Sequence, residues 1–428
     1  MSGLSLGIDI GTSGIRTAVL DESGARISSA RVPHAPQDPA AIDANQWWRS
    51  VQHCVVAQGK ALEEQGRRLR DVTRIGVDGT SGSMVFTDAT LAPVTRALMY
   101  NSSGFVSEAA HIATQAPAVH IAKGANSGLA RALRLQAEAQ QQGSGTIHLH
   151  HQADFIVAKL RGIGGVSDHN NALKLGYDPE TDRYPAWFEA VNIALSSLPN
   201  VVASGTPLGP LSADVASALG FAEDVMVHAG TTDSIAAFLA AAPLEAGAAV
   251  TSLGTTLAVK ILVSKRIDDP EIGLYSHKVG GIWLAGGASN TGGGVLAHVF
   301  DPDQIEALSH RIDATMASPL DYYPLTAPGE RFPVNDPGIQ PRMSPRPSDD
   351  TAYLHGLLES IARIEAQCYE AIIERGGDRP TQLFTAGGGA ANAAWTQIRS
   401  RVMDISIKQP REAEAAVGIA KLIAMNAG

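Results

Sequence analysis

Two aspartates stand at points where an apolar stretch meets a turn rich in glycine or threonine. Asp9 lies inside the run LGIDIGTSG (6–14), two residues before Gly11. Asp233 ends the segment AGTTD and comes just before the apolar run IAAFLAAA (235–242). A strand that only packs against a core disfavours a carboxylate, because burial penalises the charge. We therefore interpret Asp9 as a residue placed for chemistry. For Asp233 two interpretations stay open, a helix N-cap or a general base that accepts a proton from an attacking hydroxyl.

A Gly-Thr turn between two strands occurs twice in the chain, at Gly11-Thr12-Ser13 and at Gly254-Thr255. Such a turn points backbone N–H groups and a hydroxyl into the same space, which is an anion-binding arrangement. One such turn is typical of an ordinary hairpin. Two of them, one in each half, favour a nucleotide whose phosphates are held from both sides of a cleft. The sequence has neither a GxxxxGK[ST] phosphate loop nor a GxGxxG motif after a strand, so any nucleotide site uses another architecture.

Three further segments have a chemical and a structural interpretation. The run TAGGGAAN contains Gly387, Gly388 and Asn392 and is either a tight strand–helix joint or backbone passing under a base or ribose, with Trp395 as a neighbour. The run VDGTSGS (77–83) is either an Asx turn or a hydroxyl-rich loop suited to a polyol. The histidines of HLHHQAD have no zinc-ligand spacing and are interpreted as packing or surface residues.

The order of elements predicts an α/β protein of two related halves. Each half opens with a strand, a Gly-Thr turn and a strand, and helices follow. We expect helices over 46–66, 351–377 and 414–428, mostly helix from about 104 to 160, and an ordered loop or linker over the proline-dense stretch 322–350.

Bulk composition excludes several classes of protein. The chain has 428 residues, 44% hydrophobic and 18% charged, with a net charge of −10, which argues against broad binding to nucleic acid or to an anionic membrane. The apolar run at 235–244 is too short to span a bilayer. With no basic n-region at the start and only two cysteines, Cys54 and Cys368, we expect a cytoplasmic protein.

Several segments taken together resemble the FGGY carbohydrate kinases of the actin-like ATPase superfamily, in the family's order from residue 6 to about residue 420. They are GIDIGTSGIRTAVLD, VDGTSG, AGTTDSIAAFLA, TSLGTT, GERFPVNDP, HGLLESIARIEAQCYE and TAGGGAANAAW. The resemblance implies two ribonuclease-H-like (actin/hexokinase-type) domains with a nucleotide and sugar cleft between them. It implies an N-terminal sugar-binding domain at 1–240, to which 414–428 returns, and a C-terminal nucleotide-binding domain at 241–413. ATP and Mg²⁺ are the implied cosubstrate and metal, and the protein is expected to be a monomer or homodimer.

The resemblance also assigns roles residue by residue. Asp233 matches the catalytic base, and Asp9 matches the aspartate near the reacting hydroxyl, reaching Mg²⁺ through water. Asp9, Ser81 and Asp233 match the sugar contacts. The ATP-binding residues that it implies are Gly11, Thr12, Ser13, Gly254, Thr255, Gly293, Gly387, Gly388 and Asn392.

Within the family, VDGTSG, DHNNALKLGYD, YSHK and GERFP look most like D-ribulose kinases of the xylulose-kinase-like type. Typical xylulokinases carry Gln-Met-His-Gly where this chain has Thr80-Ser81-Gly82-Ser83, which argues against D-xylulose. The expected reaction is ATP-dependent phosphorylation of the terminal hydroxyl of D-ribulose to D-ribulose 5-phosphate. The alternatives are a kinase for D-xylulose, L-ribulose or ribitol, and a non-catalytic actin-like ATP-binding protein. Retention of both Asp9 and Asp233 speaks against the last, because binding alone needs no base.

Overall fold

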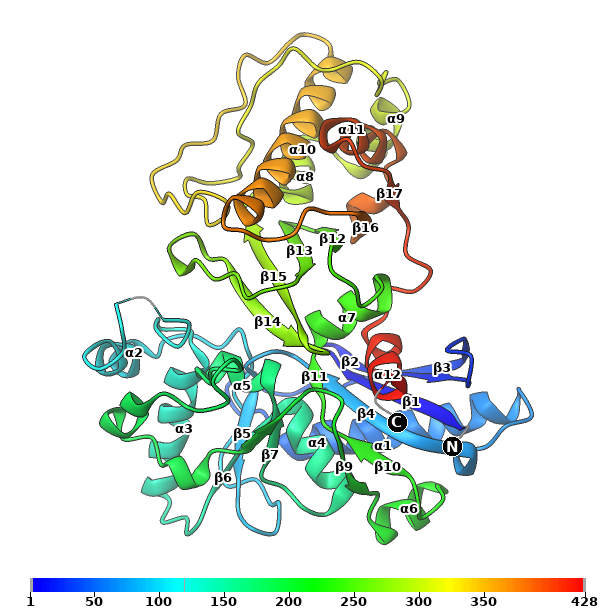
Figure 1. Ribbon diagram of the computed structural model, residues 1–428, viewed down its shortest axis with the longest axis vertical. Coiled ribbons are helices and arrows are strands. Elements are labelled where there is room, and N and C mark those ends of the chain that lie inside the picture. The colour runs from blue at the N-terminus through cyan, green and yellow to red at the C-terminus, as the bar shows by residue number, and fades with distance from the viewer. Residues whose placement is uncertain (1–2, 119, 426–428) are drawn as a thin grey trace. The chain divides into compact units, whose positions relative to one another are not determined.

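The computed structural model describes residues 3–118 and 120–425 and has a mixed α/β architecture (Figure 1). Contacts within the chain divide it into two units. Unit 1 comprises Met1–Ala240 and Glu412–Gly428, and unit 2 comprises Ala241–Arg411. Each unit is built on one large sheet, of seven strands in unit 1 and six in unit 2.

The large sheet of unit 1 is mixed. β1 (Leu4–Ile10) pairs antiparallel with β2 (Gly14–Leu20) on one side and parallel with β4 (Val72–Gly79) on the other. The strand order is β3-β2-β1-β4-β10-β9, and the short β11 also pairs with β4. The remaining strands of this sheet are β3 (Arg26–Pro33), β9 (Pro207–Pro210), β10 (Met226–His228) and β11 (Thr231–Thr232).

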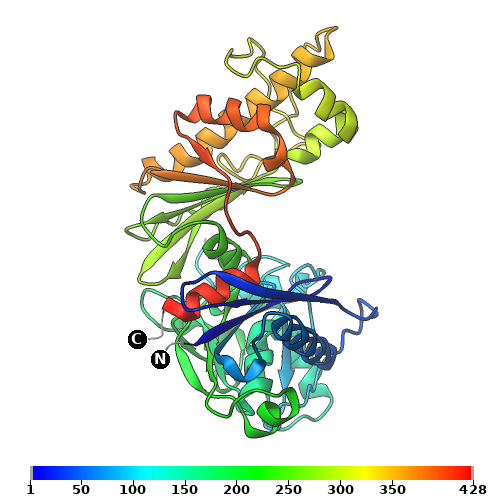
Figure 2. The ribbon, with the colours of Figure 1, turned by 90° about the vertical axis from the view of Figure 1, so that its right-hand side faces the viewer.

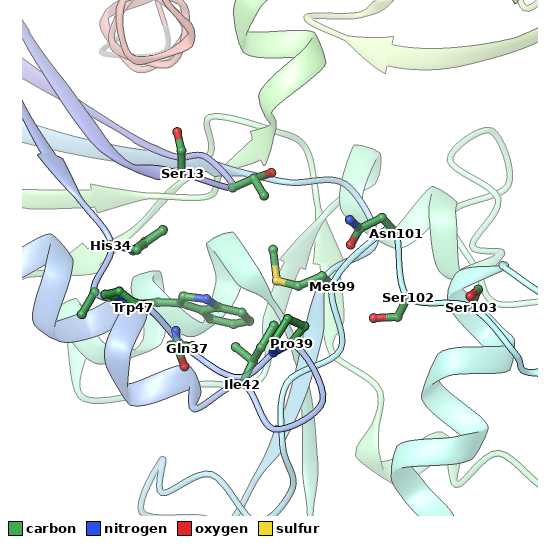
Figure 3. A pocket seen from close by; sticks show the side chains of 13 residues that line it. Ser13, His34, Gln37, Pro39, Ile42, Trp47, Met99, Asn101, Ser102 and Ser103 are labelled. Carbon is green, nitrogen blue, oxygen red and sulfur yellow. The ribbon is translucent and has the colours of Figure 1, made fainter.

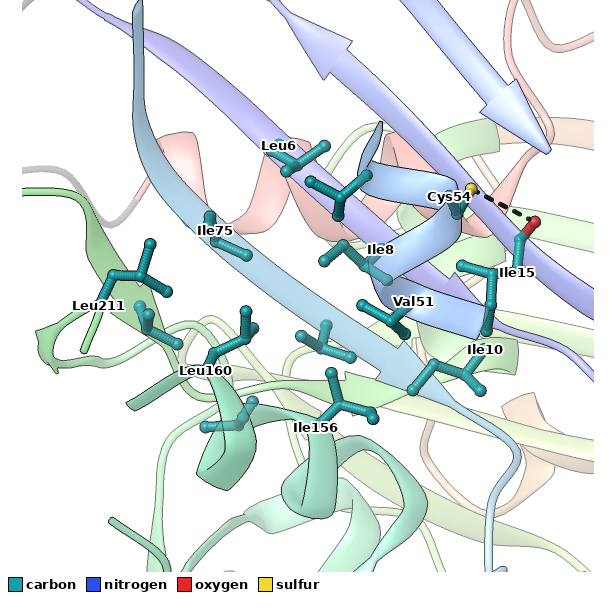
Figure 4. Close-up of a cluster of buried hydrophobic side chains, with 14 of the residues drawn as sticks. Leu6, Ile8, Ile10, Ile15, Val51, Cys54, Ile75, Ile156, Leu160 and Leu211 are labelled. Atoms are coloured by element: carbon teal, nitrogen blue, oxygen red, sulfur yellow. Dashed lines mark hydrogen bonds between the residues drawn. The ribbon is translucent and has the colours of Figure 1, made fainter. Parts of the chain in front are cut away.

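Helices cover both faces of this sheet because successive side chains of a strand point to opposite faces. Leu6, Ile8 and Ile10 of β1 are fully buried in a core shared with α1 (Ala44–Glu63) and α4 (Gln152–Arg161) (Figure 4). The opposite face of β1 packs on α12 (Ala415–Met425), and a Cβ at Gly7 would lie 1.9 Å from the carbonyl oxygen of Ala416. Figure 2 shows α12 as the red helix lying over the blue strands of this sheet. Asp9 alternates with the core residues of β1 and so lies on the α12 face.

A second core within unit 1 is formed by buried side chains from Met84, at the start of β5 (Met84–Thr87), to Ile193. The sequence predicts mostly helix from about 104 to 160 in this region. Residues 148–151 instead form a strand that pairs antiparallel with β5. Pairing with an existing strand overrides the weak local preference of four residues. The elements outside the large sheet are β5 (Met84–Thr87), α2 (Val106–Ala113), α3 (Gly128–Gln141), β6 (His148–His151), β7 (Val166–Asp168), α5 (His169–Leu175), β8 (Asn200–Val202) and α6 (Ala213–Leu219). α7 (Asp233–Ala241) follows β11 directly.

Unit 2 repeats the central pairing of unit 1. β12 (Ala248–Leu253) pairs antiparallel with β13 (Leu257–Val263) and parallel with β16 (Gln382–Ala386), as β1 pairs with β2 and β4. The strand order is β14-β15-β13-β12-β16-β17. Its other elements are β14 (Tyr275–Val279), β15 (Ile282–Ser289), α8 (Gly293–Val299), α9 (Pro302–Ser309), α10 (Asp350–Glu374), α11 (Ala393–Met403) and β17 (Ile407–Lys408).

The long helix α10 is the centre of the core of unit 2, with its buried face against the sheet and α11.

Within the described part of the chain, no helix combines the length and the apolar character needed to cross a bilayer.

Candidate active site

Three aspartates meet at the carboxyl edge of the unit 1 sheet. Asp9 and Asp78 are register partners in the parallel pair β1–β4, and Asp78 is opposite Thr231 in the parallel pair β4–β11. Asp233 follows Thr232 and begins α7. Because parallel strands end at the same edge, residues 224 positions apart in sequence (233 − 9) are brought to adjacent strand ends. This edge is where open α/β sheets bind their ligands.

Asp9 is buried and held by one guanidinium. Its carboxylate accepts a hydrogen bond from Arg16 Nη1 at 3.0 Å, and its exposed fraction is 3%. Burial raises the pKa of Asp9, and the charge and hydrogen bond of Arg16 act against that rise. Arg16 is its cross-strand partner in the β1–β2 hairpin. Sequence analysis missed this pairing, although a hairpin turning at residues 11–13 already sets the two residues opposite each other.

Asp78 has a more extreme environment than Asp9. It is fully buried, and neither carboxylate oxygen receives a hydrogen bond from a donor in the described residues. Burial raises its pKa well above the ordinary value, and the nearby carboxylates of Asp9 and Asp233 raise it further. Asp78 is therefore the member of the cluster that holds a proton most readily, and Asp9 is a neighbour with which it can share that proton.

Asp233 is half-buried at the first position of α7. Its Oδ1 accepts a hydrogen bond from the backbone N–H of Ser234 at 2.7 Å. The helix start fixes the carboxylate at the sheet edge. The arrangement is compatible with both interpretations of this residue, because a carboxylate bonded to a helix amide still accepts a proton.

The turn between β1 and β2 presents free backbone amides. Gly11 N–H donates to the carbonyl of Gly14 at 3.0 Å, whereas the amides of Thr12 and Ser13 donate no hydrogen bond within the described part of the chain. Thr12 and Ser13 are exposed. Gly14 must lack a side chain, since a Cβ there would lie 2.4 Å from the carbonyl oxygen of Val32. Two unpartnered amides beside two hydroxyls are the elements of an anion site.

His34, which directly follows β3, makes hydrogen bonds to this turn. Its backbone N–H donates to Ser13 O at 3.1 Å, and its Nε2 lies 3.0 Å from Gly11 O. Since a carbonyl only accepts, Nε2 carries the proton, and Nδ1 then accepts from the Ser50 hydroxyl at 3.1 Å. Burial lowers the pKa of His34 and so favours this neutral form. No local pattern predicts this contact, because it joins residues that are distant along the chain.

The hydroxyl-rich loop after β4 uses most of its hydroxyls internally. Thr80 donates its amide and its hydroxyl to Gln152 Oε1, at 2.9 and 2.6 Å, and its hydroxyl lies 2.6 Å from Ser83 Oγ. Ser83 Oγ also accepts from the Tyr100 amide at 2.9 Å. Ser81 Oγ has no partner among the described residues. Of the three hydroxyls, Ser81 is therefore the one left to bind a ligand.

In unit 2 a second Gly-Thr turn packs directly on the start of α8. Gly293 N–H donates to Gly254 O at 2.9 Å, and Gly294 N–H donates to Thr255 O at 3.0 Å. A Cβ at Gly293 would lie 2.7 Å from Gly254 O, so only glycine allows this approach. The amides of Gly254 and Gly293 are thus engaged within the protein, whereas the Thr255 amide donates to no described residue.

The triple-glycine segment lies against the same turn. Gly387 has φ +82°, and a Cβ there would lie 2.5 Å from the carbonyl oxygen of Leu253, while Gly388 is exposed with open space around it. Asn392 caps α11 through the Trp395 amide at 2.9 Å and donates to Ser309 Oγ at 2.8 Å. The structure therefore brings the predicted nucleotide-side residues of unit 2 together. Trp395 is buried in the core of unit 2, against Gly389 of the glycine segment, and its place beside a base stays a prediction.

Comparison with known proteins identifies the family. Residues 4–126 match the N-terminal domain of the FGGY family of carbohydrate kinases, and residues 249–427 match its C-terminal domain. The chain belongs to the FGGY family of carbohydrate kinases. It is similar to the xylulose kinase of Escherichia coli K12 (22% identity over 94% of this chain and 85% of the relative) and to that of Streptomyces coelicolor (26% identity, 96% and 85%).

Solved structures of the FGGY family share the fold of this kinase. The xylulose kinase from Rhodospirillum rubrum superposes with a TM-score of 0.86 at 21% identity, covering 99% of this chain and 90% of that one. Plasmodium falciparum glycerol kinase with ADP gives 0.85 at 16% identity, covering 99% and 90%. These likenesses establish the two-domain α/β fold of the family for this chain.

A magnesium ion held partly by water fits this kinase. No group of three or more His, Cys, Asp or Glu side chains in the described residues is arranged to hold a metal by itself, the histidines of HLHHQAD included. Mg²⁺ in kinases is usually bound by one or two carboxylates, several waters and the phosphates of the nucleotide. Asp9, beside the unpartnered carboxylate of Asp78, supplies this kind of donor.

Proposed function

We propose that this FGGY kinase transfers the γ-phosphoryl group of ATP to the terminal hydroxyl of a ketopentose, with D-ribulose as the first choice of acceptor. The observation that carries the proposal is the meeting of Asp9 and Asp233 at one sheet edge, beside a turn with unpartnered amides. A strong hydrogen-bond acceptor and an anion site in the same unit are what phosphoryl transfer requires.

Each group has one part in the transfer. The hydroxyl oxygen of the acceptor forms the new bond to the γ-phosphorus, the bond to the β–γ bridging oxygen breaks, and ADP leaves with that electron pair. Asp233 accepts the hydroxyl proton. The amides of Thr12 and Ser13 donate to phosphate oxygens as charge develops on them. Mg²⁺, when bound, neutralises phosphate charge, and Asp9 holds it through water.

The assignment of D-ribulose rests on the loop after β4. The hydroxyls of Thr80 and Ser83 bond to each other, and that of Thr80 also donates to Gln152, which leaves Ser81 as a small hydroxyl contact for the sugar. The loop carries no imidazole or thioether, whereas typical xylulokinases have Gln-Met-His-Gly at these positions. D-xylulose is the second candidate, because the relatives from Escherichia coli and Streptomyces coelicolor are named xylulose kinases.

An ADP-release assay over a panel of ketopentoses and polyols, with ATP and Mg²⁺, tests the proposal. We expect turnover with D-ribulose well above D-xylulose and L-ribulose. The Asp233→Asn variant should fold normally and lose about 10²- to 10⁴-fold in kcat, the usual contribution of a positioned base. Near-normal turnover of Asp233→Asn would show that Asp233 is not the base. A higher kcat/KM for D-xylulose than for D-ribulose would make D-xylulose the preferred acceptor.

A further inference from the structure

The core of unit 2 contains a fully buried ion pair that joins α10 to α11. Arg399 Nε donates to Glu365 Oε2 at 2.6 Å, and Arg399 Nη2 donates to Glu365 Oε1 at 2.7 Å. Neither side chain is exposed to solvent. Taking two charges out of water is costly, and well-packed apolar side chains at such positions are often at least as stabilising. Stability by itself therefore does not account for this pair.

The ion pair is also bonded to two neighbouring strands of the unit 2 sheet. Thr251 of β12 donates its hydroxyl to Glu365 Oε1 at 2.5 Å, and Arg399 Nη1 donates to the Thr385 hydroxyl of β16 at 2.9 Å. Since the Thr251 proton is used in this way, the Tyr369 hydroxyl donates to Thr251 Oγ1 at 2.9 Å. Thr251 and Thr385 are buried register partners in the parallel pair β12–β16. We call these five residues the buried network.

The strands that the buried network joins end at segments predicted to hold the nucleotide. Gly254 stands three residues after Thr251 (254 − 251), and Gly387 stands two residues after Thr385 (387 − 385). The two segments lie against each other, because a Cβ at Gly387 would be 2.5 Å from Leu253 O. So close a contact tolerates little displacement of one strand along the other. The buried network adds side-chain bonds to the backbone pairing directly before these segments.

Arg399 also restricts the helix that Asn392 caps. Asn392, Trp395 and Arg399 follow one another at intervals of three and four residues, so they share one face of α11. Asn392 accepts from the Trp395 amide at 2.9 Å, and a Cβ at Gly389 would lie 2.7 Å from the Trp395 ring. The bidentate bond of Arg399 to Glu365 therefore limits rotation of α11 and movement of Asn392.

Unit 1 has apolar residues at the equivalent positions of its own repeat. Ile8 stands three residues before Gly11 (11 − 8), and both Ile8 and its register partner Val77 are fully buried (Figure 4). The turn of unit 1 is instead supported by His34, which bonds to Gly11 O and borders a cavity of about 550 Å³ together with Ser13 (Figure 3). Apolar packing thus suffices to hold this strand pairing, and the buried network of unit 2 has a further role.

We infer that Glu365 and Arg399 are positioning residues for the nucleotide, which hold the ends of β12 and β16 and the start of α11 in the arrangement that binds it. Because both side chains are fully buried, they act through the Gly-Thr turn, the glycine segment and Asn392. The inference rests on the proposed function, since it takes the predicted residues of unit 2 as the nucleotide side of the kinase. Loss of the buried network should weaken nucleotide binding and leave acceptor binding unchanged.

The test replaces the buried network by apolar side chains in the triple variant Glu365→Leu/Arg399→Met/Thr385→Val. Thr251 keeps the Tyr369 hydroxyl as a partner, so the urea midpoint should be close to that of the wild type or above it. Calorimetry with ADP and Mg²⁺ should show a Kd about tenfold higher than that of the wild type, because the phosphate contacts are misplaced. The KM for ATP should rise by a similar factor, while the KM of the acceptor changes less than about twofold.

The matched control is the second ion pair between the same helices, Glu359–Arg401. Arg401 also donates to the carbonyls of Ala314 and Met316, which lie outside β12 and β16. Glu359→Leu/Arg401→Met should therefore leave the Kd of ADP within about twofold of the wild type. Thr385→Val removes only the bond to β16 and should weaken ADP about threefold, whereas Thr385→Ser keeps the hydroxyl and should not.

The outcomes separate this inference from the proposed function. If no acceptor accelerates ADP release but the triple variant binds ADP more weakly and the control does not, the proposed transfer fails and the positioning role stands. If the triple variant does not fold, the comparison of Thr385→Val with Thr385→Ser decides. The inference is overturned if the variants of the buried network bind ADP as tightly as the wild type, if the control weakens ADP equally, or if the wild type does not bind ADP.

Discussion

Replacing Asp78 by asparagine should stabilise the protein increasingly as pH rises. Burial and the neighbouring carboxylates of Asp9 and Asp233 raise the pKa of Asp78 well above its ordinary value. Between the ordinary aspartate pKa of about 3.9 and the raised one, the native state binds a proton that the unfolded chain does not. The free energy of unfolding therefore falls with rising pH across that window, by up to about 1.4 kcal/mol per pH unit for one proton. Asparagine does not titrate, and its amide can donate to Asp9 in place of the shared proton.

The assay is urea unfolding of wild type and Asp78→Asn from about pH 5 to pH 8, where most proteins are near their greatest stability. The difference in free energy should grow with pH in favour of the variant. Asp88→Asn is the control, because hydrogen bonds from Thr90 and Ala92 lower the pKa of Asp88, so its free-energy difference from wild type should not change with pH across this range. The stabilising contribution of Asp88 is present at neutral pH and is lost as pH falls through its lowered pKa. Equal pH slopes for wild type and Asp78→Asn would refute the reasoning, and so would a variant less stable at every pH.

Three more substitutions test how the sites are supported. His34→Phe removes two side-chain hydrogen bonds and should cost about 1–3 kcal/mol of stability. Because it loosens the phosphate turn, it should lower kcat by a larger factor than it changes the KM of the acceptor. Equal factors in kcat and KM would mean that the role of His34 is only structural. Gly418→Ala places a Cβ 1.7 Å from a backbone carbonyl of α7 and should cost about 1–3 kcal/mol and reduce turnover, whereas Gly145→Ala, with open space around it, should do neither. Arg399→Leu leaves the fully buried Glu365 without its cation and should cost about 3–5 kcal/mol in urea unfolding, and a loss below about 1 kcal/mol would contradict the ion pair.

The repeated elements of the fold were readable in the sequence because their signals are local. Alternating apolar residues around Gly11 and around Gly254 predicted two strand–turn–strand units, and both are present as β1–β2 and β12–β13. The helix expected at 351–377 is α10. The strand at 148–151 escaped prediction, because four residues carry little propensity and their pairing with β5 is a contact across the fold.

The sequence by itself determined which residue types could do chemistry, namely the aspartates and the glycine turns, and where they stand along the chain. Only the tertiary structure decided their environment. Asp78 is a buried acid because β4 pairs with both β1 and β11. The Thr80 hydroxyl is engaged by Gln152 of a distant helix, and the Ser83 hydroxyl is engaged by Thr80 and by the Tyr100 amide. His34 supports the phosphate turn through a contact between elements that no local pattern specifies. The physical reason is that burial, hydrogen-bond partners and cavities are properties of neighbours in space, which a one-dimensional pattern of residues does not contain.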